Sequence, residues 1–155
     1  MSRKKVTVVK KYKYVINALV LILPMIYLYQ SLNPVFPPVL ETKTLGEYSI
    51  TPMPYTETAP YQHDGVYVKD FLLMFEKGDV ANIRQAYLNI AAQPLPLKKL
   101  EHEEMGILHG TPHGQHVHAL SSESLRASDK IWLTLQQWDG SVETISWDIP
   151  ENLLP

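Results

Sequence analysis

The chain has 155 residues, enough for one ordinary domain and a short appendage. It contains no cysteine, which excludes thiolate zinc sites, iron–sulfur clusters and disulfides. Six of its 14 basic residues precede residue 14, where no acidic residue lies, so the other 8 basic residues face all 16 acidic ones. The larger part of the chain would therefore repel a phosphate backbone, and we expect no nucleic-acid partner.

The amino-terminal segment has the pattern of a membrane anchor. Residues 14–32 carry no formal charge, and nineteen residues of helix measure about 28 Å, close to the hydrocarbon thickness of a bilayer. Residues 1–13 form a basic tail that the positive-inside rule keeps in the cytoplasm. We expect an integral, single-pass protein of the cytoplasmic (inner) membrane with a periplasmic carboxy-terminal domain. A cleaved signal peptide is the alternative, although the segment lacks an Ala-x-Ala exit.

A proline-rich linker is predicted over residues 33–43, because Pro34, Pro37 and Pro38 favour extended backbone. An extracytoplasmic domain then covers residues 44–155. Runs rich in β-branched and aromatic residues predict strands at residues 45–53, 65–76, 83–90, 115–120, 130–138 and 141–149. Six or seven short strands are typical of a mainly β fold, here a small antiparallel β-sandwich or, as the alternative, a small β-barrel.

Residues 79–92 fit two structures. Their apolar spacing suits a helix with Asp79 as N-cap, but the end of the segment also fits a strand. We favour a strand preceded by a turn at Lys77-Gly78-Asp79. Residues 95–105, with two neighbouring prolines and a cluster of charges, predict a loop.

The last two predicted strands flank Asp139-Gly140, a dipeptide favoured in two-residue type I′ hairpin turns. A two-residue turn would pair Trp132 with Trp147. Trp132, Trp138 and Trp147 would then share one face, which is either covered by a second layer, the favoured interpretation, or open to a partner. The opposite, core face would hold Ile131, Leu133, Leu135 and Val142.

Four of the six histidines lie within ten residues, in the His-rich segment 109–118. If residues 115–120 are a strand, His116 and His118 point to the same face with Cα atoms about 6.5 Å apart. Gly110 and Gly114 allow the preceding loop to fold back over that strand. Neutral imidazole is the commonest protein metal ligand. We therefore predict a metal site with the ligands His109, His113, His116 and His118.

All-nitrogen ligation favours zinc, with copper as the alternative. Further ligands could come from other segments of the chain, namely from His63, His102 and Glu123. A flexible surface segment that binds nickel or zinc only adventitiously is the competing interpretation.

The spacing of Gly110, His116, His118 and Glu123 resembles the first metal-binding motif of the cupins. In that family two histidines and the glutamate bind an ion inside a β-barrel, with a further histidine from a second motif. The resemblance therefore implies that His116, His118 and Glu123 are ligands of a cupin-like metalloenzyme. It covers about fourteen residues; Lys130 stands where the motif closes with glycine, and no second motif follows.

The sequence contains no phosphate-binding glycine loop, nucleophile elbow or cysteine nucleophile. We therefore expect no enzyme but a membrane-anchored accessory protein that handles, senses or delivers zinc or copper, with a metal-transport or membrane-complex protein as partner. The first alternative is a non-enzymatic interaction or assembly subunit of an inner-membrane complex that uses the tryptophan face. The cupin-like metalloenzyme is the second.

Overall fold

The computed structural model describes residues 8–112 and 114–155, which form two compact units divided after Val35. The first contains one helix, α1 (Val8–Leu32), with Pro24 inside it. Its segment Tyr12–Leu32 is long and apolar enough to cross a membrane, and its side chains are exposed. The helix fits a membrane anchor or a signal sequence. It begins before residue 14, since lysine is a good helix former; the rest of the predicted basic tail, residues 1–7, lies outside the described residues.

The predicted linker is only partly a spacer. Residues 34–42 have no regular secondary structure, as expected for proline-rich chain. Leu40, however, is buried and donates its backbone N–H to the carbonyl of Pro52 at 2.8 Å. The indole Nε1 of Trp147 donates to the carbonyl of Glu41 at 2.6 Å. The second half of the linker is therefore bound to the β domain.

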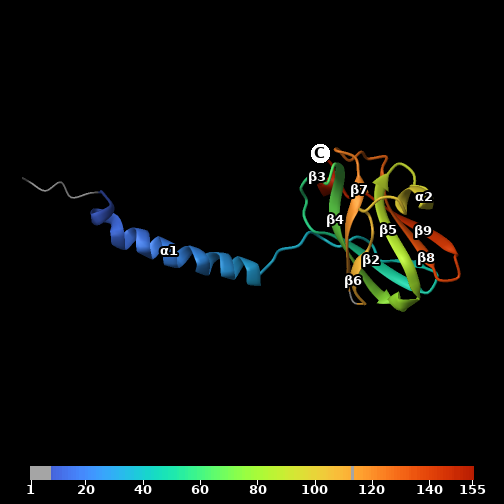
Figure 1. Cartoon of the computed structure of the whole chain (residues 1–155), viewed down its shortest axis with the longest axis horizontal. Helices are drawn as coiled ribbons and strands as arrows, with labels where there is room; N and C mark the ends of the chain where they lie inside the picture. Colours follow the sequence, from blue (N-terminus) through green and yellow to red (C-terminus); the bar gives the residue numbers. More distant parts are fainter. Residues whose placement is uncertain (1–7, 113) are drawn as a thin grey trace, which may run out of the picture. The chain divides into compact units, whose positions relative to one another are not determined.

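The second unit is mainly β and its strands form one sheet (Figure 1). The sheet order is β1-β2-β4-β7-β5-β8-β9, with β3 paired to β4 and β6 paired to β7. All pairs are antiparallel except the short contact between β5 and β7. The strands are β1 (Lys43–Leu45), β2 (Tyr48–Pro54), β3 (Tyr61–His63), β4 (Val66–Lys77), β5 (Ile83–Ala91), β6 (His109–Thr111), β7 (Gly114–Ser121), β8 (Lys130–Gln137) and β9 (Val142–Asp148).

The sheet curls into a nearly closed, barrel-like form. Its two end strands approach each other, and Lys43 Nζ on β1 donates to the carbonyl of Ser146 on β9 at 2.9 Å. The interior is filled by aliphatic and aromatic side chains from every long strand, which alternate with outward-facing residues. Fully buried members of this core include Tyr48, Ile50, Phe71, Leu73, Val117, Ile131, Leu133 and Trp147.

All six predicted strands are confirmed, with ends that move by up to three residues. The strands β1, β3 and β6 were not predicted, because three residues are too few to give a periodic pattern.

Residues 79–92 form the favoured turn and strand, not the alternative helix. Asp79 caps a single turn of 3-10 helix (Val80–Asn82), and β5 follows. Gly78 has a φ of +87°, and a Cβ there would clash with the Tyr48 ring. The loop predicted at 95–105 contains one helical turn, α2 (Leu97–Leu100).

The β8–β9 hairpin differs from the predicted register by one residue. Gln137 and Ser141 close a three-residue turn, in which the N–H of Gly140 donates to the carbonyl of Gln137 and Gly140 has a φ of +87°. A glycine at positive φ as the third loop residue is typical of the three-residue hairpin, not of the two-residue type I′ turn. The turn prediction was therefore wrong.

This shift of one residue changes the face of every side chain on β9. Trp147 now lies opposite Ile131 and is 2% exposed in the core, while Trp132 lies opposite Ser146 and is half-buried. Trp138 sits in the turn and is 70% exposed. The three tryptophans thus share no face, and the predicted core residue Val142 is exposed.

Replacing Trp147 should test this corrected register. We expect Trp147→Ala to destabilise the full chain by about 3–5 kcal/mol, because it removes a large buried side chain. Trp138→Ala, the matched control, should cost less than about 1 kcal/mol, since its indole is mostly exposed. Denaturant unfolding in detergent, followed by near-ultraviolet circular dichroism, measures both. Equal losses of stability would contradict the assignment of Trp147 to the core.

Candidate metal centre

The candidate site lies on the outer face of the β4–β7 strand pair. Asp70 on β4 is directly opposite His118 on β7. Residues directly opposite each other in an antiparallel pair point to the same side of the sheet. Their neighbours Phe71 and Val117, also opposite each other, are fully buried on the core side. Asp70, His116 and His118 therefore project away from the core.

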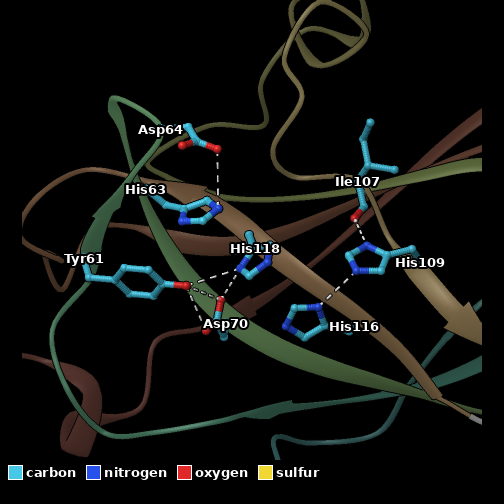
Figure 2. Close-up of polar contacts among 8 residues, drawn as sticks. All are labelled: Tyr61, His63, Asp64, Asp70, Ile107, His109, His116 and His118. Carbon is cyan, nitrogen blue, oxygen red and sulfur yellow. Dashed lines mark hydrogen bonds and ion pairs between the residues drawn. The ribbon is translucent and has the colours of Figure 1, made fainter.

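Four imidazole rings meet on this face, supplied by three strands (Figure 2). His116 and His118 on β7 have ring centres 4.6 Å apart. The ring of His109 on β6 lies 5.1 Å from that of His116, which it faces across the β6–β7 pair. The ring of His63, at the end of β3, stacks on that of His118 at 5.2 Å. The structure thus brings together three of the predicted ligands and one of the additional ones.

Asp70 and Tyr61 complete the cluster, and neither was predicted. Asp70 Oδ1 lies 2.6 Å from His118 Nδ1, and the Tyr61 hydroxyl lies 3.1 Å from both carboxylate oxygens. Asp70, His116 and His118 can each offer a ligand atom within 4.8 Å of the other two. The sequence held one signal for Asp70: a carboxylate in the middle of an apolar strand needs a partner.

The environment favours a neutral His116. Burial lowers the pKa of His116, and the neighbouring His118 and His109 lower it further, whereas the Asp70 carboxylate acts in the opposite direction. Burial is also the main reason why the pKa of Tyr61 is raised, followed by its hydrogen bond to Asp70. Near neutral pH the His116 imidazole is therefore unprotonated, as metal binding by histidine requires. The Tyr61 hydroxyl keeps its proton and can donate it in a hydrogen bond.

Two residues proposed as additional ligands are not brought into the cluster. His102 Nδ1 donates to the carbonyl of Lys98 at 2.6 Å, just beyond α2. Glu123 accepts a hydrogen bond from the Tyr67 hydroxyl, which raises the pKa of Tyr67. The side chain of Tyr67 lies on the face of β4 opposite that of Asp70. The remaining predicted ligand, His113, lies outside the described residues.

The cupin-like arrangement is not present. That resemblance implied ligands inside a barrel, but His116 and His118 point to the face opposite the buried Val117 and Ala119. Glu123 follows the end of β7 and bonds to Tyr67 instead of joining the histidines. The physical reason is the alternation of side chains along β7. His116 and His118 are two residues apart and share one face, and the core contacts the other face.

The cluster is open to solvent. His109 is exposed, and the side chains of His63 and His118 are 41% and 28% exposed. Tyr55 places its ring edge-on to that of His116, with centres 5.3 Å apart, and covers one side of it. An ion held here would be reached from outside without opening the core.

The lowered pKa of His116 gives a measurable expectation. The His116 ring of the chelator-treated full chain should titrate below about pH 6.5. Because the folded chain binds this proton less tightly than the unfolded chain, the contribution of His116 to stability is present above pH 6.5 and is lost as the pH falls toward the folded-state pKa. NMR titration of the ring protons measures the midpoint.

His118→Gln is the matching variant, since glutamine stays neutral. It should move the His116 midpoint upward, though still below 6.5, because burial remains the largest cause. A wild-type midpoint above 6.5, or a downward shift in the variant, would contradict this account.

Comparison with known proteins identifies the family of this chain. No curated protein and no solved structure matches the chain. The model of one protein family matches residues 8–150, which include both α1 and all strands of the β domain. The chain therefore belongs to the family described as "Uncharacterised conserved protein UCP029505".

Proposed function

We propose that this protein is a membrane-anchored, extracytoplasmic metal-binding accessory protein that handles, senses or delivers zinc, with copper(II) as the alternative ion. The observation that carries the proposal is the convergence of four imidazoles and one carboxylate on an open sheet face. Such a concentration of imidazole and carboxylate groups on an accessible surface supports a metal site.

The donor types support the choice of ion. Imidazole nitrogens suit zinc and copper(II), whereas calcium and magnesium prefer oxygen ligands. Among the clustered residues only Asp70 and Tyr61 carry side-chain oxygens. The chain has no cysteine, so no competing thiolate site exists in it.

The openness of the cluster supports exchange over a purely structural role. Structural zinc sites are closed by four protein ligands, whereas sites that pass on or use an ion keep a position accessible. Here the flanking histidines, His63 and His109, come from three-residue strands that each pair with one neighbour. A carrier or sensor needs such accessible ligands.

The amino-terminal helix supports the proposed location. Its length and composition support a single membrane span, and the basic residues before it support a cytoplasmic amino terminus and a periplasmic β domain. The metal cluster would then face the exterior of the cytoplasmic membrane. The contact between the end strands β1 and β9 favours a small β-barrel over a sandwich for that domain.

Metal binding tests the proposal directly. We expect the full chain, purified in detergent without a histidine tag, to bind zinc stoichiometrically near neutral pH. His116→Ala with His118→Ala should abolish this binding, whereas His102→Ala should leave it unchanged, because His102 lies outside the cluster. Elemental analysis and calorimetry measure the stoichiometry. At 100 times its Kd, zinc should stabilise the wild type by about 2.7 kcal/mol.

Acidification should weaken the same binding below about pH 6.5, since protonated imidazole does not ligate. Undiminished zinc binding in the double variant would end the proposal.

The absence of cysteine makes the topology easy to test. A single cysteine at exposed Ala127 should react with a membrane-impermeant maleimide in cells with an opened outer envelope. A cysteine at Ser2 should react only after the cytoplasmic membrane is permeabilised. The opposite labelling would reverse the proposed orientation, and loss of the Ser2 label with a shorter chain would indicate cleavage.

A second candidate function is favoured by one observation. Trp138 is 70% exposed at the tip of the β8–β9 hairpin, where its indole donates a hydrogen bond to the carbonyl of Ala81 at 3.1 Å. An exposed tryptophan suits a protein partner. A stoichiometric membrane protein that co-purifies equally well with the histidine double variant would favour this interaction subunit over the metal-binding protein.

A further inference from the structure

We infer that Asp70 and Tyr61 are positioning residues that hold the proton of His118 on Nδ1, so that Nε2 is the atom that binds metal. This inference rests on the proposed metal-binding function. In this arrangement the ion is bound by imidazole nitrogens. Asp70 does not bind the ion but forms a hydrogen bond with one of those imidazoles, that of His118.

The first step is the distance between His118 and Asp70. Two atoms bound to one tetrahedral zinc ion at about 2.0–2.2 Å lie about 3.3 Å apart. Asp70 Oδ1 and His118 Nδ1 are 2.6 Å apart, which is the length of a short, charge-assisted hydrogen bond. A carboxylate accepts and does not donate, so the proton between them belongs to Nδ1. Nε2 is then left with a free lone pair.

The second step is the support of the carboxylate. The Tyr61 hydroxyl donates to Asp70, lying 3.1 Å from both Oδ1 and Oδ2. Tyr61 on β3 is opposite Val68 on β4, two residues from Asp70 and on the same face. Its hydroxyl is also 3.3 Å from His118 Nδ1, so it lies beside the hydrogen bond that it supports (Figure 2). The arrangement is the carboxylate–histidine pair that commonly orients metal ligands.

The third step is the set of rings that remains for the ion. Imidazoles that bind one ion through nitrogens at about 2.0–2.1 Å have ring centres about 4.5–6.5 Å apart. The ring of His118 lies 5.2 Å from His63, 4.6 Å from His116 and 6.4 Å from His109. All three distances fall in that range, so these rings are spaced to share one ion without the carboxylate. Such a nitrogen set selects zinc or copper(II) over manganese, calcium and magnesium.

The test compares Asp70→Asn, Tyr61→Phe and His118→Ala in the full chain in detergent, with zinc as the probe. We expect Asp70→Asn to weaken zinc binding 10–100-fold, because asparagine accepts the Nδ1–H bond but carries no charge. Tyr61→Phe should weaken it less, whereas His118→Ala should weaken it more than Asp70→Asn. X-ray absorption of the zinc-loaded wild type and Asp70→Asn should count the same number of imidazoles. Thermal unfolding of the metal-free proteins shows whether each variant is folded.

Loss of binding in Asp70→Asn as complete as in His118→Ala would overturn the inference, because Asp70 would then be a direct ligand. So would long-range ¹H–¹⁵N NMR of the metal-free wild type that finds the His118 proton on Nε2. This second measurement needs no ion. A wild-type chain that binds no zinc would defeat the proposed function, while the NMR result would still decide whether Asp70 orients His118.

Discussion

The pairing of β4 with β7 is the constraint on which the rest of the domain depends. Its register sets Phe71 against Val117 in the core and, one residue away, Asp70 against His118 on the outer face. A slip of one residue would carry the histidines into the apolar interior and expose the core residues. The burial of apolar side chains on one face therefore determines which polar side chains meet on the other.

Two adjacent residues of β4 act on opposite faces. Lys69 points inward, is 2% exposed, and donates to the carbonyls of Thr56 and Thr58 at 3.0 and 2.6 Å. Burial lowers the pKa of Lys69, although nearby carboxylates oppose the shift. Through these bonds Lys69 holds the segment that leads into β3. The buried lysine thus helps to place Tyr61 and His63 beside the carboxylate of its neighbour, Asp70.

The cluster combines firmly and loosely held histidines. His116 and His118 belong to β7, which pairs along its length with β4 in the middle of the sheet. His63 and His109 belong to three-residue strands outside the main path of the sheet. Short strands at an edge are held by few backbone hydrogen bonds, so they open at a lower free-energy cost than central strands. This difference suits the proposed metal site, in which two histidines would stay in place while the others would admit or release an ion.

The sequence by itself determined the apolar helix, the six longer strands and the local pair His116 and His118, because each depends on the composition or periodicity of a short segment. His109 meets His116 within the same short segment, since the β6–β7 hairpin closes within a few residues. Only the tertiary structure decided the β8–β9 register, where a turn of three residues, not two, moved Trp147 into the core. Asp70 lies 48 residues before His118, and Tyr61 is farther still. Alternation along a strand shows which of its residues share a face. It does not show which distant strand lies beside it, because strand pairing depends on the packing of the whole core.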